Sequence, residues 1–366
     1  MKKIISMLLA AAISLISTAA AFAEEETQRI TLTLDEAVEY AMAHSLKIEK
    51  AQTELTKVKY EENQARINYR DYVSGGFTID EALNESGYYY RAAQIQTAQT
   101  ERNLESEKNA LKTSVKKSFY TYLNSQSKID TARDNLENTK LKYEYANTKY
   151  EQGTISRLEL KSFELAVTNA QNSLNQAERA SELALLDLKN ILNVPEGTEV
   201  TVSGEFVMHE LAYADSDTAI EMAKEQDSFL RISEGRELAE LRLKIATGWY
   251  SVNERGYSIE KATYSSAMSG FTDSENTLKY NIASLYSNIL TLKETVSYLS
   301  EYTELLRENT EASYLQYELG MITSNEYIET AQKYFASQND LIDAELNYYI
   351  TVLEYTAIYG GSADIA

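Results

Sequence analysis

The fold is decided by a short stretch that occurs twice, first as Tyr150-Glu151-Gln152-Gly153-Thr154-Ile155-Ser156 and again as Tyr317-Glu318-Leu319-Gly320-Met321-Ile322-Thr323. The residues that follow keep the same shift without a gap, so that Gln171-Asn172 corresponds to Gln338-Asn339 and Ile191 to Ile358. Such a long tandem match indicates one structural unit that is built twice.

Apolar residues on both sides of these stretches follow a seven-residue period, which is typical of helices packed along a coiled-coil seam. Before the second stretch the series is Leu278, Ile282, Leu285, Ile289, Leu292, Val296, Leu299, Leu306 and Tyr317. After the first stretch it is Phe163, Val167, Ala170, Leu174, Ala177, Ala184, Leu188 and Ile191. Glycine permits the tight bend that interrupts each series. We therefore expect an all-α fold of two long antiparallel helical hairpins, bent at Gly153 and Gly320.

A shorter helix is expected to open each half. The first covers residues 34–69 with Thr33 as its cap, and its counterpart begins at Ala219 after Asp215, Ser216 and Asp217. A long helix is expected over residues 91–150, and residues 193–202 indicate a turn and a short strand between the halves. The expected units are a signal peptide (1–23), a first helical repeat (24–193), a linker (194–214), a second helical repeat (215–360) and a tail (361–366).

The first residues have the pattern of a secretory signal. Lys2 and Lys3 precede an apolar run over residues 4–20, and Ala21-Phe22-Ala23 is a small-x-small cleavage site. An uncleaved membrane anchor is the alternative, although the run is short and rich in alanine for a spanning helix. The pattern favours an exported protein.

The charge of the chain restricts its partners. The formal net charge is -21, so an acidic surface would repel nucleic acid and would not be held electrostatically by anionic lipid head groups. Cations and basic protein surfaces are the expected counterparts, and plain solubility explains the charge equally well.

The residue types that usually carry catalysis are scarce. The chain has no cysteine and two histidines, His44 and His209, which stand far apart, so thiol chemistry, disulfides and a histidine metal cluster are excluded. No nucleophile and base pair, Walker loop or Gly-x-Gly-x-x-Gly is present. The sequence predicts no enzyme, no catalytic residue, no metal site and no cofactor.

The stretch Leu32-Thr33-Leu34-Asp35-Glu36-Ala37-Val38-Glu39-Tyr40-Ala41 resembles the first helix of the TolC-type outer-membrane efflux family. The two Tyr-x-x-Gly-x-x-Ser/Thr turns are similar to the helix tips of that family, and both features recur in tandem. The resemblance implies a homotrimer with a hollow helical cylinder, which docks through its tips onto a membrane-fusion-type adaptor that works with an inner-membrane pump.

By this resemblance, the turns at residues 152–160 and 319–327 would face the adaptor. The docking candidates are Gly153, Thr154, Ser156, Gly320, Met321 and Thr323. The bland alternative is that any long helical hairpin needs a glycine turn.

The resemblance also implies a pore constriction at the tips, formed by Tyr317, Glu326 and Glu329. The two carboxylates lie one helical turn apart, and on a threefold axis each would form a ring that attracts cations and raises the pKa of its members. The alternative is a solvated helix face. The arginine partner that the family places opposite the tyrosine is replaced here by Ile322.

The sequence departs from the family at the opposite end of the hairpins. Family members interrupt each repeat with two long strands that form a membrane barrel, whereas residues 69–90 and 247–273 lack room for such strands. Membrane insertion is therefore doubtful. Trp249, Tyr250 and Tyr257, with Phe77 and residues 88–90, form either an aromatic contact surface or local packing.

Two functions remain open on this evidence. The first is an efflux-type conduit of a cell-envelope export system, placed in the outer membrane or periplasm, or on the extracytoplasmic surface if no outer membrane exists. The second is an exported helical scaffold that conducts nothing. Their oligomeric state distinguishes them.

Overall fold

The computed structural model describes residues 29–73, 78–195, 197–204 and 213–361, and within these residues the chain is almost entirely helical. The predicted signal peptide and most of the predicted tail lie outside the described residues. The elements in chain order are β1 (Arg29–Leu32), α1 (Leu34–His44), α2 (Leu46–Arg70), α3 (Ile79–Glu85), α4 (Tyr88–Glu151), α5 (Arg157–Leu192), β2 (Glu199–Val202), α6 (Ser216–Ala223), α7 (Asp227–Trp249), α8 (Arg255–Glu318) and α9 (Ser324–Ile358).

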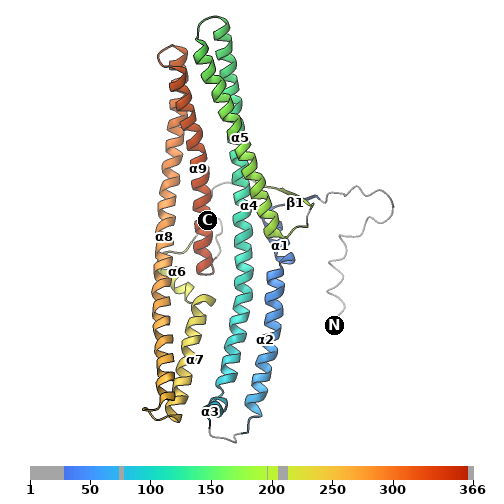
Figure 1. Cartoon of the computed structure of the whole chain (residues 1–366), viewed down its shortest axis with the longest axis vertical. Coiled ribbons are helices and arrows are strands. Elements are labelled where there is room, and N and C mark those ends of the chain that lie inside the picture. The colour runs from blue at the N-terminus through green and yellow to red at the C-terminus, as the bar shows by residue number, and fades with distance from the viewer. Residues whose placement is uncertain (1–28, 74–77, 196, 205–212, 362–366) are drawn as a thin grey trace, which may run out of the picture.

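Two long hairpins lie side by side and confirm the predicted duplicated fold (Figure 1). Helices α4 and α8 have 64 residues each, so each extends about 96 Å at 1.5 Å per residue. Along one half of this length α5 packs on α4 and α9 on α8; along the other half α2 and α7 take their places. We call the end with the α4–α5 and α8–α9 turns the tip end, and the opposite end the base end.

The predicted seams are the buried faces of these helices. Ile282 and Ile289 of α8 are fully buried, as is Leu188 of α5, while the polar residues between them face solvent. Most of the stability of a helix within a protein comes from packing of its apolar face, so burial of these periodic apolar stripes stabilises the long helices.

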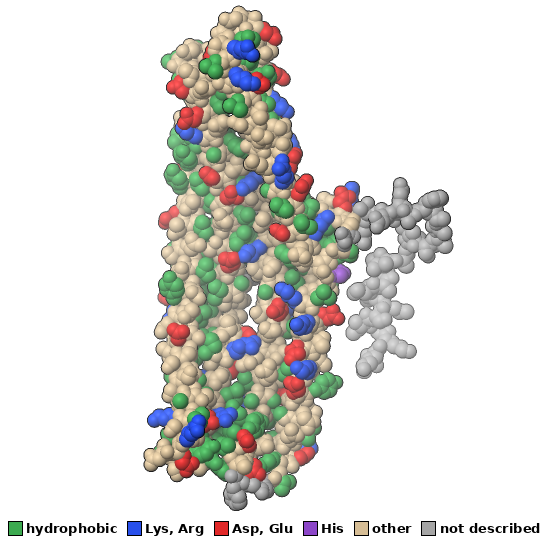
Figure 2. Space-filling view, in the orientation of Figure 1, with side chains coloured by type: hydrophobic (Ala, Val, Ile, Leu, Met, Phe, Trp, Pro, Cys, Tyr) green, Lys and Arg blue, Asp and Glu red, His purple; other side chains and the backbone are tan. Residues whose placement is uncertain are grey.

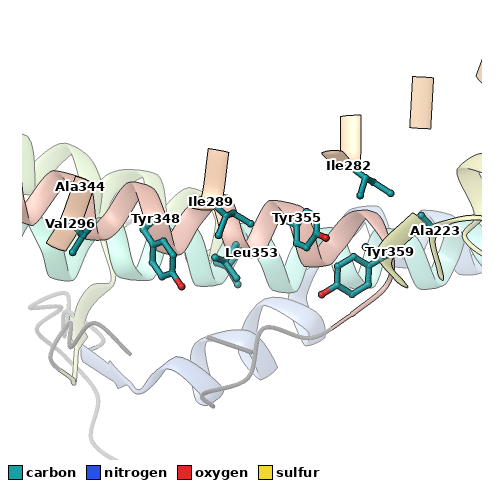
Figure 3. Close-up of a cluster of buried hydrophobic side chains, with 11 residues drawn as sticks. Ala223, Ile282, Ile289, Val296, Ala344, Tyr348, Leu353, Tyr355 and Tyr359 are labelled. Carbon is teal, nitrogen blue, oxygen red and sulfur yellow. The ribbon is translucent and has the colours of Figure 1, made fainter. Parts of the chain in front are cut away.

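Tyrosine fills the core of the second repeat, where Tyr348 and Tyr355 of α9 pack against Ile282 and Ile289 of α8 (Figure 3). The hydroxyl of Tyr355 donates a hydrogen bond of 2.9 Å to the backbone carbonyl of Ala214. The backbone N–H of Ala214 donates in turn to the hydroxyl of Tyr359 at 3.1 Å. A buried phenol needs a polar partner. These hydrogen bonds therefore hold the start of the second repeat against its last helix, α9.

The expected single helix over residues 34–69 is wrong: the structure has two helices, α1 and α2, separated at Ser45. Ser45 has an extended backbone (ψ 110°), and its hydroxyl accepts the N–H of Ile48 at 3.4 Å, so it ends one helix and caps the next. Thr33 caps α1 in a capping box with Glu36, and Asp215 caps α6, both as predicted. The second repeat has the same break, between α6 and α7.

The linker contains the predicted short strand, β2, and the structure adds a partner that the sequence analysis missed. Strand β1 pairs with β2 in parallel, in the register of Ile30 with Val200 and Leu32 with Val202. Leu32 and Val200 are buried against α1, α4 and α5 in one cluster. The alternation of Ile30, Thr31 and Leu32 was the available signal for β1.

At the base end the two repeats differ. Helix α3 stands between α2 and α4, whereas five residues connect α7 to α8. Among the described residues the strands are β1 and β2, so the segments 69–90 and 247–273 contain helices and turns, in line with the expectation that they lack long strands. No helix in the described part of the chain is both long enough and apolar enough to cross a membrane.

Helix α4 joins the two repeats. Lys117 and Lys128 form ion pairs of 2.6 Å with Glu354 and Asp343 of α9. Toward the base end, Arg102 lies between Asp227 and Glu234 of α7, at 3.1 and 2.6 Å. Asp227 and Glu234 are largely buried, so their pairs with Arg102 are less screened than the half-exposed lysine pairs and hold one hairpin against the other.

Candidate docking site at the helix tips

Each tip is closed by the same two devices. Gly153 adopts a left-handed conformation (φ 72°), its N–H donates to the carbonyl of Tyr150 at 2.9 Å, and the N–H of Thr154 donates to the carbonyl of Lys149 at 2.9 Å. This Schellman pattern satisfies the last carbonyls of α4. Gly320 (φ 70°) repeats it, with hydrogen bonds from Gly320 to Tyr317 and from Met321 to Gln316.

The returning helices start with capping boxes. The N–H of Glu159 donates to the hydroxyl of Ser156 at 3.2 Å, while the Glu159 carboxylate accepts the N–H of Ser156 at 3.0 Å. Thr323 and Glu326 form the same pair, at 3.3 and 2.7 Å. Ser156 and Thr323, two of the docking candidates, are thus the N-caps of α5 and α9.

The structure gives Glu326 and Glu329 partners within the chain. Hydrogen bonds from the backbone and hydroxyl of Thr323 hold the pKa of Glu326 below its usual value. This is the opposite direction from the raised pKa expected of a carboxylate ring, which would need several copies of the chain. Glu329 pairs with Lys333 at 2.8 Å on the exposed face of α9. Both acids therefore have local roles as a cap and a surface ion pair.

Tyr317 lies in a cluster that binds the two tips together, apart from the exposed Glu326 and Glu329. Its ring stacks on Tyr327 at 6.2 Å and contacts Phe163 at 5.6 Å. Ala146, Phe163, Tyr317 and Tyr327, which come from all four long helices, form the buried part of what we call the tip cluster. Burial raises the pKa of Tyr327 to about 12, so this phenol stays neutral at physiological pH.

Two lysines of α4 extend the tip cluster toward α8. Lys149 forms an ion pair with Glu318 at 2.8 Å, and its ammonium lies 5.0 Å from the centre of the Tyr317 ring. The Lys142 ammonium lies 3.1 Å from the centre of the Tyr314 ring, and burial lowers the pKa of this lysine. Sequence reasoning missed both contacts, because the periodic pattern identifies buried positions without showing which helices meet.

A groove of about 240 Å³ lies beside the tip cluster, between α4, α5 and α9. Phe163, Tyr327 and Phe335 form its apolar side, and Asn135, Thr139 and Lys142 line its polar side. The groove separates the tips from the next buried cluster, which is formed by Ile129, Ala132, Leu136, Ala170 and Leu174.

The outer surface of the tips carries exposed apolar side chains among polar ones. Leu158, Leu319 and Met321 are 77%, 75% and 70% exposed, and the nearby Gly153, Thr154, Gly320 and Thr323 are exposed as well. All six predicted docking residues, Ser156 and Met321 included, are exposed. Exposed leucines on two adjacent turns form a surface that favours contact with another protein.

Neither the tips nor the rest of the described residues contain a group of histidines and carboxylates arranged to hold a metal ion. His44 stacks on Tyr40 at 4.1 Å, and its Nδ1 lies 2.8 Å from the carbonyl of Tyr40. His209 lies outside the described residues.

Comparison with known proteins gives a consistent result. Residues 88–194 match the outer membrane efflux protein family. No curated protein sequence matches the chain. The structure is similar to that of CusC (TM-score 0.75, 10% identity, 90% of this chain and 92% of that chain covered), whose structures concern transmembrane channel formation.

Two further solved structures share the fold. The Campylobacter jejuni outer membrane channel CmeC has a TM-score of 0.69 at 12% identity over 91% of this chain and 86% of its own. The Vibrio cholerae outer membrane protein VceC has a TM-score of 0.71 at 12% identity over 90% and 97%. The matched family is one of outer membrane efflux proteins, which agrees with the prediction of a non-enzymatic protein.

Proposed function

We propose that this chain, whose residues 88–194 match the outer membrane efflux protein family, is a divergent relative of the TolC-type proteins and the conduit of a cell-envelope export system. In this proposal the exported chain forms a homotrimer, and the tips dock onto a membrane-fusion-type adaptor that works with an inner-membrane pump. The pair of matched, apolar tips held together by the tip cluster is the observation that carries the proposal.

The tips have the properties that a docking site needs. Four backbone and capping interactions close each turn, so little conformational entropy remains to be lost when a partner binds. The two tips are held at a fixed distance by the Lys149–Glu318 ion pair and the tyrosines around it. Leu158, Leu319 and Met321 then offer apolar contacts at the end of this rigid unit.

The two flanks of the chain support assembly with further copies. Helices α5 and α8 lie on opposite flanks of the rod (Figure 1). Leu158, Leu165 and Leu186 of α5 are exposed, as are Tyr298 and Leu305 of α8 and Leu319 just after it. Within each set the spacings are seven residues or a multiple of seven, as in a coiled-coil seam. A seam that joins the α5 flank of one copy to the α8 flank of the next is heterologous and closes into a ring.

The oligomeric state tests this proposal most directly. A mass measurement in solution and end-on electron microscopy should give a closed trimer with a central opening. A monomer at high concentration would contradict the conduit and support the second interpretation of the sequence, an exported scaffold that conducts nothing.

Docking at the tips has a separate test, which the absence of cysteine makes simple. Met321→Cys and Thr154→Cys variants should cross-link to a membrane-fusion-type adaptor. Val252→Cys, which is equally exposed at the base end, is the matched control and should not cross-link. Equal cross-linking of all three variants would contradict docking at the tips.

A further inference from the structure

The turn between α7 and α8 differs from the rest of the chain in both charge and exposed side chains. It contains the single tryptophan, Trp249, which is 39% exposed, followed by Val252 at 66% and Ile259 at 51%. These residues belong to the end of α7, the turn after it and the start of α8, which lie at the extreme end of the rod (Figure 1). We call this surface, formed by residues 244–261, the base patch.

The base patch is basic although the chain is strongly acidic. Its residues 244–261 contain three basic and two acidic side chains: Lys244, Glu254, Arg255, Glu260 and Lys261. Glu260 is buried, and Arg242 neutralises it at 2.9 Å. Lys244, Arg255 and Lys261 are therefore opposed by Glu254 alone within this segment, and Figure 2 shows basic side chains gathered at this corner beside an apolar area.

The start of α8 adds to this positive character. Glu254 precedes α8 without capping it through its side chain, and the first turn of the helix has no acidic residue. Arg255 instead occupies the first helical position, beside N–H groups that already carry partial positive charge. By contrast, α5 and α9 each begin with an acidic side chain bound to those groups.

The turn is held in one shape by the ring of Tyr250. A Cβ atom at Gly256 would lie 2.5 Å from this ring, so the ring rests directly on the backbone of the first turn of α8. The N–H of Tyr250 donates to Ala246 at 2.8 Å, and that of Glu254 to Ser251 at 2.9 Å. The ring of Tyr250 is therefore taken up by this packing, whereas the side chains of its neighbours Trp249 and Val252 are exposed.

We infer that the base patch binds the surface of a bilayer that contains anionic lipids. Tryptophan and tyrosine prefer the interface between head groups and hydrocarbon, and lysine and arginine beside them are attracted to anionic head groups. The exposed Val252 and Ile259 supply the apolar contact. Such binding is peripheral and needs no membrane-spanning segment.

The net charge of the whole chain does not prevent this contact. At physiological salt, charges are screened over about 8 Å, whereas α8 extends about 96 Å from the patch to the tips. A bilayer at the base end therefore interacts electrostatically only with the side chains nearest to it. The connection from α2 to α4 at the same end has four acids against two bases over residues 70–91, so the attraction is confined to the α7–α8 side.

The single tryptophan provides the test. The exported chain, from Glu24 onwards, is titrated with vesicles of phosphatidylcholine and phosphatidylglycerol, and with phosphatidylcholine alone, while Trp249 emission and vesicle flotation are recorded. We expect a blue shift and flotation with the anionic vesicles, both reversed by high salt. No shift, or the same shift with neutral vesicles, would overturn the inference, as would a lipid-free shift that grows with protein concentration.

Variants that retain Trp249 locate the contact. Val252→Asp should weaken vesicle binding roughly tenfold, and Arg255→Gln with Lys261→Gln roughly 25-fold, because each basic residue near an anionic surface contributes about fivefold. Met321→Asp, equally exposed at the tip end, is the control and should bind as the unaltered chain does. Circular dichroism verifies that each variant is folded. Weakening by Met321→Asp alone would overturn the inference, and tip docking would remain separately testable.

Discussion

The helices turn back at both the tip end and the base end of the rod, but the two ends stabilise these turns in different ways. At the tips, both copies close with a left-handed glycine and a capping box, so each turn satisfies its own hydrogen bonds. At the base, α4 and α8 both begin without a side-chain cap, and tyrosine rings pack on glycines instead: Tyr69 near Gly87 and Tyr250 near Gly256. Turns closed by their own hydrogen bonds are alike in the two repeats, whereas turns held by side-chain packing differ between them.

The largest expected effect concerns two tyrosines at equivalent positions of the repeats. Tyr317 is buried in the tip cluster and Tyr150 is 39% exposed. Tyr317→Ala should lower the free energy of unfolding by about 3 kcal/mol, because it removes a buried aromatic ring. Tyr150→Ala should lower it by about 0.5 kcal/mol or less. Urea unfolding measures both, and equal losses would contradict the difference in burial.

A companion variant separates the ring of Tyr317 from its hydroxyl, which is buried and has no hydrogen-bond partner among the described residues. Tyr317→Phe should therefore leave the stability unchanged or raise it by up to about 1 kcal/mol. A clear loss of stability would mean that the Tyr317 hydroxyl has a hydrogen-bond partner.

Replacing glycine with alanine should lower the stability at the tip end and raise it at the base end. Gly153→Ala and Gly320→Ala should each cost about 1 to 2 kcal/mol, because a Cβ is disfavoured in the left-handed conformation. Gly248→Ala, in the last turn of α7 where a Cβ meets nothing within 4 Å, should stabilise by about 0.5 kcal/mol. Thermal unfolding of the three variants tests the signs.

Substitutions at the helix N-caps should also change the stability in opposite directions at the two ends. Ser156→Ala and Thr323→Ala should each cost about 1 kcal/mol by loss of a capping hydrogen bond. Glu254→Ser would supply the cap that α8 lacks and should gain about 0.5 kcal/mol. Hydrogen exchange at the first turns of α5, α8 and α9 measures the local effect.

The smallest effect is a pH dependence of the tips. Since the pKa of Glu326 is lowered in the folded chain by its bonds to Thr323, its contribution to stability is present above the ordinary pKa of 4.5 and is lost as the pH falls through the folded value. Glu326→Gln should flatten this part of the stability profile between pH 5 and pH 3. An unchanged profile would show that the carboxylate is not bound by Thr323.

The contrast between the ends also explains which features the sequence revealed. The hairpins, the seams, the turns at Gly153 and Gly320, and the caps at Thr33 and Asp215 were predictable, because each depends on residues close in the chain. The break at Ser45, strand β1 and helix α3 were missed, since short elements carry weak periodic signals. The neighbours of Tyr317 in the tip cluster could not be deduced, because they depend on how two hairpins pack.

Each repeat begins and ends at nearly the same place. Ala214, at the start of the second repeat, is bound by Tyr355 and Tyr359 at its end. In the first repeat, the Asn193 side chain, just past α5, donates to the carbonyl of His44, at the end of α1, at 3.2 Å. A unit whose ends meet can be copied in tandem through a linker of modest length without disturbing either core. Gene duplication could therefore double such a hairpin in a single event, with the junction already in position.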